Sequence, residues 1–277
     1  MSEPLVQGLN DAQREAVLHG EGPLLVLAGA GSGKTRVIVH RIARLVQDLG
    51  VAPWHVLAVT FTNKAAGEMK ERLLGLLGPQ ANELWVQTFH AFGARFLRRE
   101  AARAGLPPSF AIYDDDDQLR VVKRIFEELK VEDGEPLTAR QALTRIDRWK
   151  NVALLPDEVK VGEYDVEGSL AKEVYARFER ALARAGAVDF GDLLVRPVRL
   201  LEQDEALRRR WAQRFRHLLV DEFQDTNPAQ YRLLKLLAGE KRNVCVVGDD
   251  DQAIYRWRGA DVSNILGFDQ DFPGTRV

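Results

Sequence analysis

A glycine-rich segment that ends in a lysine and a threonine is the clearest chemical signal in this sequence. The apolar run 24–27 is followed by Ala28-Gly29-Ala30-Gly31-Ser32-Gly33-Lys34-Thr35. Glycines let backbone N–H groups approach phosphate oxygens, and the N-terminus of the following helix adds partial positive charge. Lys34 can then reach the β- and γ-phosphates of a nucleotide while Thr35 ligates Mg²⁺. The segment predicts a triphosphate site; a glycine-rich loop that binds no phosphate is the alternative.

A pair of carboxylates far downstream complements this loop. The apolar run His217–Val220 ends in Asp221 and Glu222. Beside a bound nucleotide, Asp221 can hold Mg²⁺ through its hydration shell, and Glu222 can orient or deprotonate the attacking water. The alternative is an acidic strand end without a partner.

A third segment follows the apolar run 243–249 and mixes polar, aromatic and basic side chains. Gln252 comes shortly after the expected strand end, where it can sense a γ-phosphate, and Tyr255, Trp257 and Arg258 follow it. Aromatic faces interleaved with arginines are typical of sequence-tolerant binding to single-stranded nucleic acid. Trp257 lies between two arginines, which favours exposure. For Tyr255, a core position and an exposed position both stay open.

The elements that must position these residues alternate between strand and helix. Apolar, β-branched runs occur at 24–27, 56–61, 84–89, 217–220 and 243–249. Most are followed by segments with helical spacing, such as the one that opens at Thr62-Asn63, where Asn63 is our expected cap. Strands that alternate with helices predict an α/β fold with a parallel sheet and right-handed crossovers. Ligands collect beyond the carboxyl ends of such strands.

Residues 94–205 have a different sequence pattern, because strand-like runs disappear and amphipathic helical patterns replace them. We predict an inserted, all-helical region with helices at 93–104, 115–129, 138–150, 169–185 and 190–203. The acidic run Asp114–Asp117 is better explained as a capped first helical turn than as a metal site. The basic cluster Arg145, Arg148 and Lys150 is expected to be a solvated face.

Composition sets broad limits. The chain has 277 residues, a net charge of −2 and 45% hydrophobic residues. No apolar run approaches the ~20 residues of a membrane span, and the N-terminus lacks the regions of a signal peptide, so we expect a cytoplasmic protein. The charge neither indicates nor excludes nucleic-acid binding, because a local basic or aromatic groove suffices. The single cysteine, Cys245, is expected to be a buried structural thiol.

Taken in order, these segments resemble the UvrD/PcrA/Rep helicases of superfamily 1. The resemblance rests on Gln13, the loop 28–35, Thr60–Ala66, Thr88-Phe89-His90, Asp221–Thr226 and Gly248–Ala260. It implies a RecA-like P-loop ATPase domain, 1A, formed by residues 1–93 and 206–277. A helical domain, 1B, would interrupt it at residues 94–205.

The resemblance also implies roles for individual residues. Gln13 would read adenine, Arg36 would lie against the adenine ring, and Ala28–Thr35 would bind the phosphates of ATP. Lys34, Thr35, Asp221, Glu222 and Gln252 would form the hydrolytic site with Mg²⁺. A path for single-stranded DNA would be lined by Phe61, Thr62, Asn63, Thr88, His90, Tyr255, Trp257 and Arg258. Members of this family translocate 3′ to 5′ and serve DNA repair or replication restart.

The largest departure from the family is one of extent. Family members continue into a second RecA-like domain, 2A, with its own inserted domain, 2B, whereas this sequence stops at Val277. The arginine fingers that complete catalysis belong to the second domain, so we expect weak binding of ATP and DNA, little turnover and no unwinding. Three alternatives stay open: a fold-retaining binding module without ATPase chemistry, a different P-loop enzyme, and an RNA-directed helicase. The sequence does not predict an oligomeric state.

Overall fold

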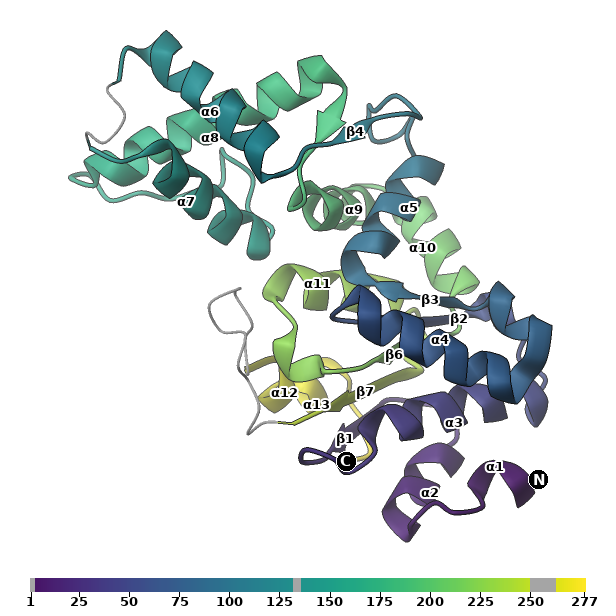
Figure 1. The fold of residues 1–277 in the computed structure, drawn as a ribbon. Coiled ribbons are helices and arrows are strands. Elements are labelled where there is room, and N and C mark those ends of the chain that lie inside the picture. Colours follow the sequence, from purple (N-terminus) through teal and green to yellow (C-terminus); the bar gives the residue numbers. More distant parts are fainter. Residues whose placement is uncertain (1–2, 132–135, 250–262) are drawn as a thin grey trace. The chain divides into compact units, whose positions relative to one another are not determined.

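The computed structural model describes residues 3–131, 136–249 and 263–277 (Figure 1). The chain forms two compact units, Met1–Phe89 with Asp204–Val277, and His90–Gln203. The unit boundaries therefore come at 89/90 and 203/204, where the sequence suggested 93/94 and 205/206. No helix in the described ranges is long and apolar enough to cross a membrane.

The first unit is built on a five-stranded sheet with the order β1-β7-β6-β2-β3. Its strands are β1 (Leu24–Leu27), β2 (Val56–Thr60), β3 (Trp85–Thr88), β6 (His217–Val220) and β7 (Val244–Gly248). All neighbouring strands are parallel, which confirms the predicted fold class. Their carboxyl ends therefore meet at one edge of the sheet.

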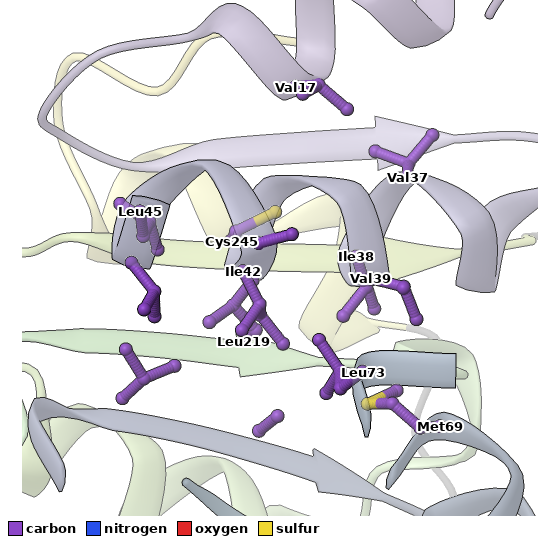
Figure 2. Close-up of a cluster of buried hydrophobic side chains, with 14 of the residues drawn as sticks. Val17, Val37, Ile38, Val39, Ile42, Leu45, Met69, Leu73, Leu219 and Cys245 are labelled. Carbon is purple, nitrogen blue, oxygen red and sulfur yellow. The ribbon is translucent and has the colours of Figure 1, made fainter. Parts of the chain in front are cut away.

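Helices of the first unit connect and cover these strands. They are α1 (Glu3–Val6), α2 (Asp11–Leu18), α3 (Lys34–Gln47), α4 (Asn63–Leu77), α10 (Glu205–Arg214), α11 (Pro228–Leu237), α12 (Ser263–Leu266) and α13 (Phe268–Asp271), with 3₁₀ turns η1 (Pro53–His55), η2 (Gly78–Glu83) and η3 (Phe223–Asp225). Figure 2 shows Ile38 and Ile42 of α3 in one buried cluster with Leu219 and Cys245 of the sheet. Cys245 is buried, as the sequence predicted.

The cap of α4 differs from the expectation. Thr62, rather than Asn63, is the N-cap: its backbone is extended, and its Oγ1 accepts a hydrogen bond from the Ala65 N–H at 3.1 Å. Asn63 is already the first helical residue. Threonine and asparagine are both preferred N-cap residues, so two adjacent candidates leave the helix boundary undecided in the sequence.

The second unit is mostly helical. Its helices are α5 (Phe89–Arg99), α6 (Asp115–Leu129), α7 (Ala139–Asn151), α8 (Val166–Ala185) and α9 (Asp192–Gln203). Helix α6 has the predicted limits, and Asp114 caps it through a reciprocal capping box with Asp117. The expectation of an all-helical insert needs one correction, because β4 (Ala111–Ile112) and β5 (Ala187–Val188) form a short parallel sheet. Strands of two residues are too short to show a period in the sequence.

The prediction that Lys150 lies on a solvated face is wrong. Lys150 is only 1% exposed, and its Nζ donates hydrogen bonds to Asp189 at 2.7 Å and to Asp192 at 2.8 Å. Lys150 follows Ala142 and Ile146 at steps of four along α7, and both of these residues are buried as well. The lysine therefore lies on the apolar face of its helix, where Asp189, Asp192 and Glu179 compensate its charge.

Candidate active site

The predicted phosphate-binding loop lies between β1 and α3. Gly31 and Gly33 have positive φ angles of 71° and 86°, a backbone region that favours glycine. A Cβ atom at Gly33 would lie 2.8 Å from Nε2 of Gln13. Gly33 also precedes the first turn of α3, whose free N–H groups are the anion-binding element of such loops.

Lys34 lies under this loop and is only 9% exposed. Its Nζ donates to the carbonyl oxygens of Ala28 at 2.9 Å and of Gly29 at 3.2 Å. The same nitrogen is 3.4 Å from Oδ2 of Asp249, at the end of β7. The ammonium group is thus held at the base of the loop, where it can attract phosphate oxygens.

The expected magnesium ligands lie together. Oγ1 of Thr35 donates a hydrogen bond of 2.9 Å to Oδ2 of Asp221. Burial raises the pKa of Asp221 above its usual range, and the hydrogen bond from Thr35 opposes that shift. A hydroxyl and a carboxylate at this distance are hard oxygen donors of the kind that Mg²⁺ prefers, so the residues present fit the ion.

Glu222 follows Asp221 with a left-handed backbone, φ 51° and ψ 47°. Its carboxylate accepts a hydrogen bond of 2.7 Å from Nε2 of Gln224. Oε1 of Gln224 in turn accepts the Asp249 N–H at 3.0 Å. The sequence analysis gave no role to Gln224 or Asp249, although both lie in the stretches Asp221–Thr226 and Gly248–Ala260 that carry the family resemblance.

Gln13 and Arg36 belong to the same part of the first unit. Nε2 of Gln13 donates to the carbonyl of Ser32 at 2.8 Å, and its Oε1 accepts the Asn10 N–H at 3.1 Å. The amide therefore connects α2 with the phosphate-binding loop. Arg36 is exposed in the first turn of α3. Adenine recognition by this pair stays a prediction.

Three of the residues expected to line a DNA path follow β2, and a fourth ends β3. Phe61 is partly exposed, and Thr62 and Asn63 are exposed. Thr88 pairs with Thr60 across the two strands and is 7% exposed, so it offers little surface to a ligand. Gln252, Tyr255, Trp257 and Arg258 lie outside the described residues.

His90 belongs to the second unit, where it stacks on Phe190. The two ring centroids are 3.8 Å apart and the rings are inclined by 17°. Phe190 is 54% exposed, although large apolar side chains are usually buried. Sequence reasoning placed Phe190 only at the start of a helix and missed this pair. Its exposed aromatic face is the kind of surface on which unpaired bases stack.

The order of the strands distributes these residues along the sheet edge. The ends of β1, β7 and β6 are neighbours and carry the phosphate-binding loop, Asp249 and Asp221 with Glu222. The ends of β2 and β3 come next and carry Phe61–Asn63 and Thr88. A parallel sheet with this loop after its first strand and a carboxylate pair after β6 defines an α/β P-loop nucleotide-binding domain.

Comparison with known proteins identifies the family. Residues 9–273 match the family model described as the UvrD/REP helicase N-terminal domain, and the chain belongs to this family. It is similar to proteins named ATP-dependent DNA helicase PcrA: 46% identical over 280 residues to that of Bacillus subtilis (strain 168), and 46% over 277 residues to that of Leuconostoc citreum. These matches cover 100% and 99% of this chain but only 37% of each relative, so the chain spans little more than a third of their length.

Proposed function

We propose that this chain is the ATP-binding and single-stranded-DNA-binding N-terminal part of an ATP-dependent helicase that moves 3′ to 5′ on DNA in the cytoplasm. The observation that carries the proposal is the convergence of Lys34 and Thr35, at the start of α3, with Asp221 and Glu222, which follow β6. The names of the similar proteins support it.

In this proposal the chain's own groups divide the work of ATP hydrolysis. The N–H groups of the loop 28–33 and Lys34 hold the phosphates, while Thr35 and Asp221 hold Mg²⁺. When bound, Mg²⁺ neutralises phosphate charge. Glu222 orients the attacking water and accepts its proton. By resemblance, Gln252 senses the γ-phosphate, and Gln13 and Arg36 contact adenine.

The DNA strand is proposed to run along the ends of β2 and β3. Phe61, Thr62 and Asn63 offer a partly exposed aromatic ring and polar groups there. By resemblance, His90, Tyr255, Trp257 and Arg258 also contact the strand; within the second unit, His90 stacks on Phe190. The full-length protein would act on 3′-tailed duplex DNA with its domains 2A and 2B.

The chain by itself is proposed to bind ATP and DNA weakly and to turn ATP over slowly. Helicases of this family complete the site with arginines of a second domain, and such fingers contribute about 10³–10⁵ in rate in phosphoryl-transfer enzymes. Movement on DNA also needs two domains that close and open around nucleotide.

Two variants test the assigned roles. Lys34→Ala should lose ATP-Mg²⁺ binding in calorimetry, whereas Glu222→Gln should bind ATP and lose single-turnover hydrolysis. If both variants bind ATP like the parent chain, the roles are wrong. No ATP binding by the parent would favour a binding module without ATPase chemistry. Side-by-side titration with single-stranded DNA and RNA oligonucleotides distinguishes a DNA helicase from an RNA helicase.

A further inference from the structure

Six residues around the candidate active site form a chain of polar contacts, which the peptide bond between Lys34 and Thr35 closes into a ring. Lys34 approaches Asp249 at 3.4 Å, the Asp249 N–H donates to Gln224, and Gln224 donates to Glu222. The Glu222 N–H donates to Asp221 at 3.1 Å, and Thr35, the neighbour of Lys34, donates to Asp221 at 2.9 Å. The ring therefore joins the start of α3 to the ends of β6 and β7.

Gln224 bridges Glu222 and Asp249 through one uncharged side-chain amide. It is 2% exposed. Its amide donates to a carboxylate at 2.7 Å and accepts a backbone N–H at 3.0 Å. A flipped amide would place oxygen against the carboxylate and NH₂ against N–H, so the two partners fix its orientation.

The backbone that carries Gln224 is held firmly. The preceding Phe223 is fully buried, and its ring packs edge-on against Tyr231 and Phe268, both at 5.6 Å between centroids. On the other side, a Cβ atom at Gly248 would lie 3.0 Å from Oε1 of Gln224. The Gln224 amide is therefore closely packed and has little room to move.

We propose that Gln224 is the positioning residue that holds the Glu222 carboxylate for hydrolysis and joins it to Asp249 at the end of β7. The inference rests on the proposed function. Phosphate and Mg²⁺ compete directly for Lys34, Thr35 and Asp221, whereas the two bonds of Gln224 involve none of these groups. The link between Glu222 and the β7 end therefore persists when the remaining contacts of the ring exchange for ligand.

Two substitutions separate the two bonds of Gln224. Gln224→Glu keeps the shape and the acceptor for the Asp249 N–H but sets a carboxylate against Glu222. Gln224→Met removes both bonds at similar volume. Gln230→Glu is the matched control, because Gln230 is also buried and its Oε1 accepts the Asn227 N–H at 2.9 Å, a bond that glutamate retains.

The measurements are ATP-Mg²⁺ affinity by calorimetry, hydrolysis in single turnover with the chain in excess, and amide hydrogen exchange at Asp249 without nucleotide. Gln224→Glu should bind ATP within about threefold of the parent and hydrolyse it about 10- to 100-fold more slowly, as expected for a misplaced reacting group. In Gln224→Met, the backbone amide hydrogen of Asp249 should in addition exchange about tenfold faster than in the parent chain. Gln230→Glu should match the parent in all three measurements.

Parental hydrolysis by Gln224→Glu, or an equal loss in Gln230→Glu, would overturn the proposal. Unchanged exchange at Asp249 in Gln224→Met would overturn it as well, and this measurement needs no nucleotide. Failure of the parent chain to bind ATP would instead refute the proposed function, while the exchange result still decides whether Gln224 holds the β7 end.

Discussion

Replacing Lys150 by methionine should strongly destabilise the second unit. The ammonium group of Lys150 is buried and lies 2.6 Å from Glu179, 2.7 Å from Asp189 and 2.8 Å from Asp192. These carboxylates come from α8, from the residue that follows β5, and from the start of α9, so one cation links three segments to α7. Methionine preserves the apolar stem and leaves the three carboxylates without this partner.

The size of the effect follows from the burial of this cluster. Removing one partner of a buried ion pair costs about 3–5 kcal/mol, a large share of the ~5–15 kcal/mol that stabilises a typical domain. Burial raises the pKa of Glu179 to about 7 and raises that of Asp189. A carboxyl group whose pKa is raised on folding destabilises the folded state above that pKa, and the penalty fades as pH falls through it. The loss in Lys150→Met should therefore be larger at pH 8 than at pH 6.

Hydrogen exchange of peptides from α7, α8 and α9 measures this loss within the whole chain, and urea unfolding gives its size. Lys123→Met is the matched control, since Lys123 is exposed on α6 and should change stability by less than about 0.5 kcal/mol. Adding Asp189→Asn and Asp192→Asn to Lys150→Met should recover part of the loss, because Glu179 is then the one carboxylate left of the three and Arg196 lies 3.6 Å from it. A loss below about 1 kcal/mol, or one that does not depend on pH, would refute this reasoning.

Three further outcomes are expected. Burial raises the pKa of Asp221 above that of an ordinary aspartate, which is about 3.9. On acidification, the affinity for ATP-Mg²⁺ should therefore begin to fall at a higher pH than an ordinary aspartate would give. Calorimetry of Asp221→Asn should not show this part of the pH dependence. Burial raises the pKa of Cys245 to about 11, so the folded chain should resist iodoacetamide at pH 8 and react only after denaturation, as mass spectrometry will show. Gly93→Ala should abolish or severely weaken folding of the second unit, because its Cβ would lie 1.7 Å from the carbonyl oxygen of Leu193. Gly67→Ala, where the added Cβ meets nothing within 4 Å, should instead raise the thermal midpoint, and a midpoint loss in both variants would contradict this reasoning.

Much of the fold could be predicted because its signals are local. The strands of the five-stranded sheet lie in mostly apolar runs of four or five residues, and the start of α6 is set by a capping residue and the residues of its own first turn. The phosphate-binding loop is likewise contained in eight consecutive residues. Where two neighbours could both cap, as Thr62 and Asn63 could, local information was not sufficient.

The errors concern residues whose environment is made by distant segments. Lys150 meets Asp192 across 42 positions of sequence, and Asp249 meets Lys34 across 215. The ring contact of Phe190 is with His90, which lies on helix α5, 100 positions earlier in the sequence. A charge run or a lone aromatic carries no information on such partners, so its burial and contacts follow from topology alone.

Strand order is the topological fact with the largest consequence for the candidate site. Strand β6 lies between β7 and β2, so the carboxylates after β6 border the nucleotide-binding residues on one side and the predicted DNA-binding residues on the other. The Asp221 N–H donates a hydrogen bond of 3.0 Å to the carbonyl of Val59 in β2, two residues before Phe61. This backbone hydrogen bond links Asp221 directly to the end of β2. Because buried backbone bonds are costly to leave unmade, the two strand ends are expected to move together.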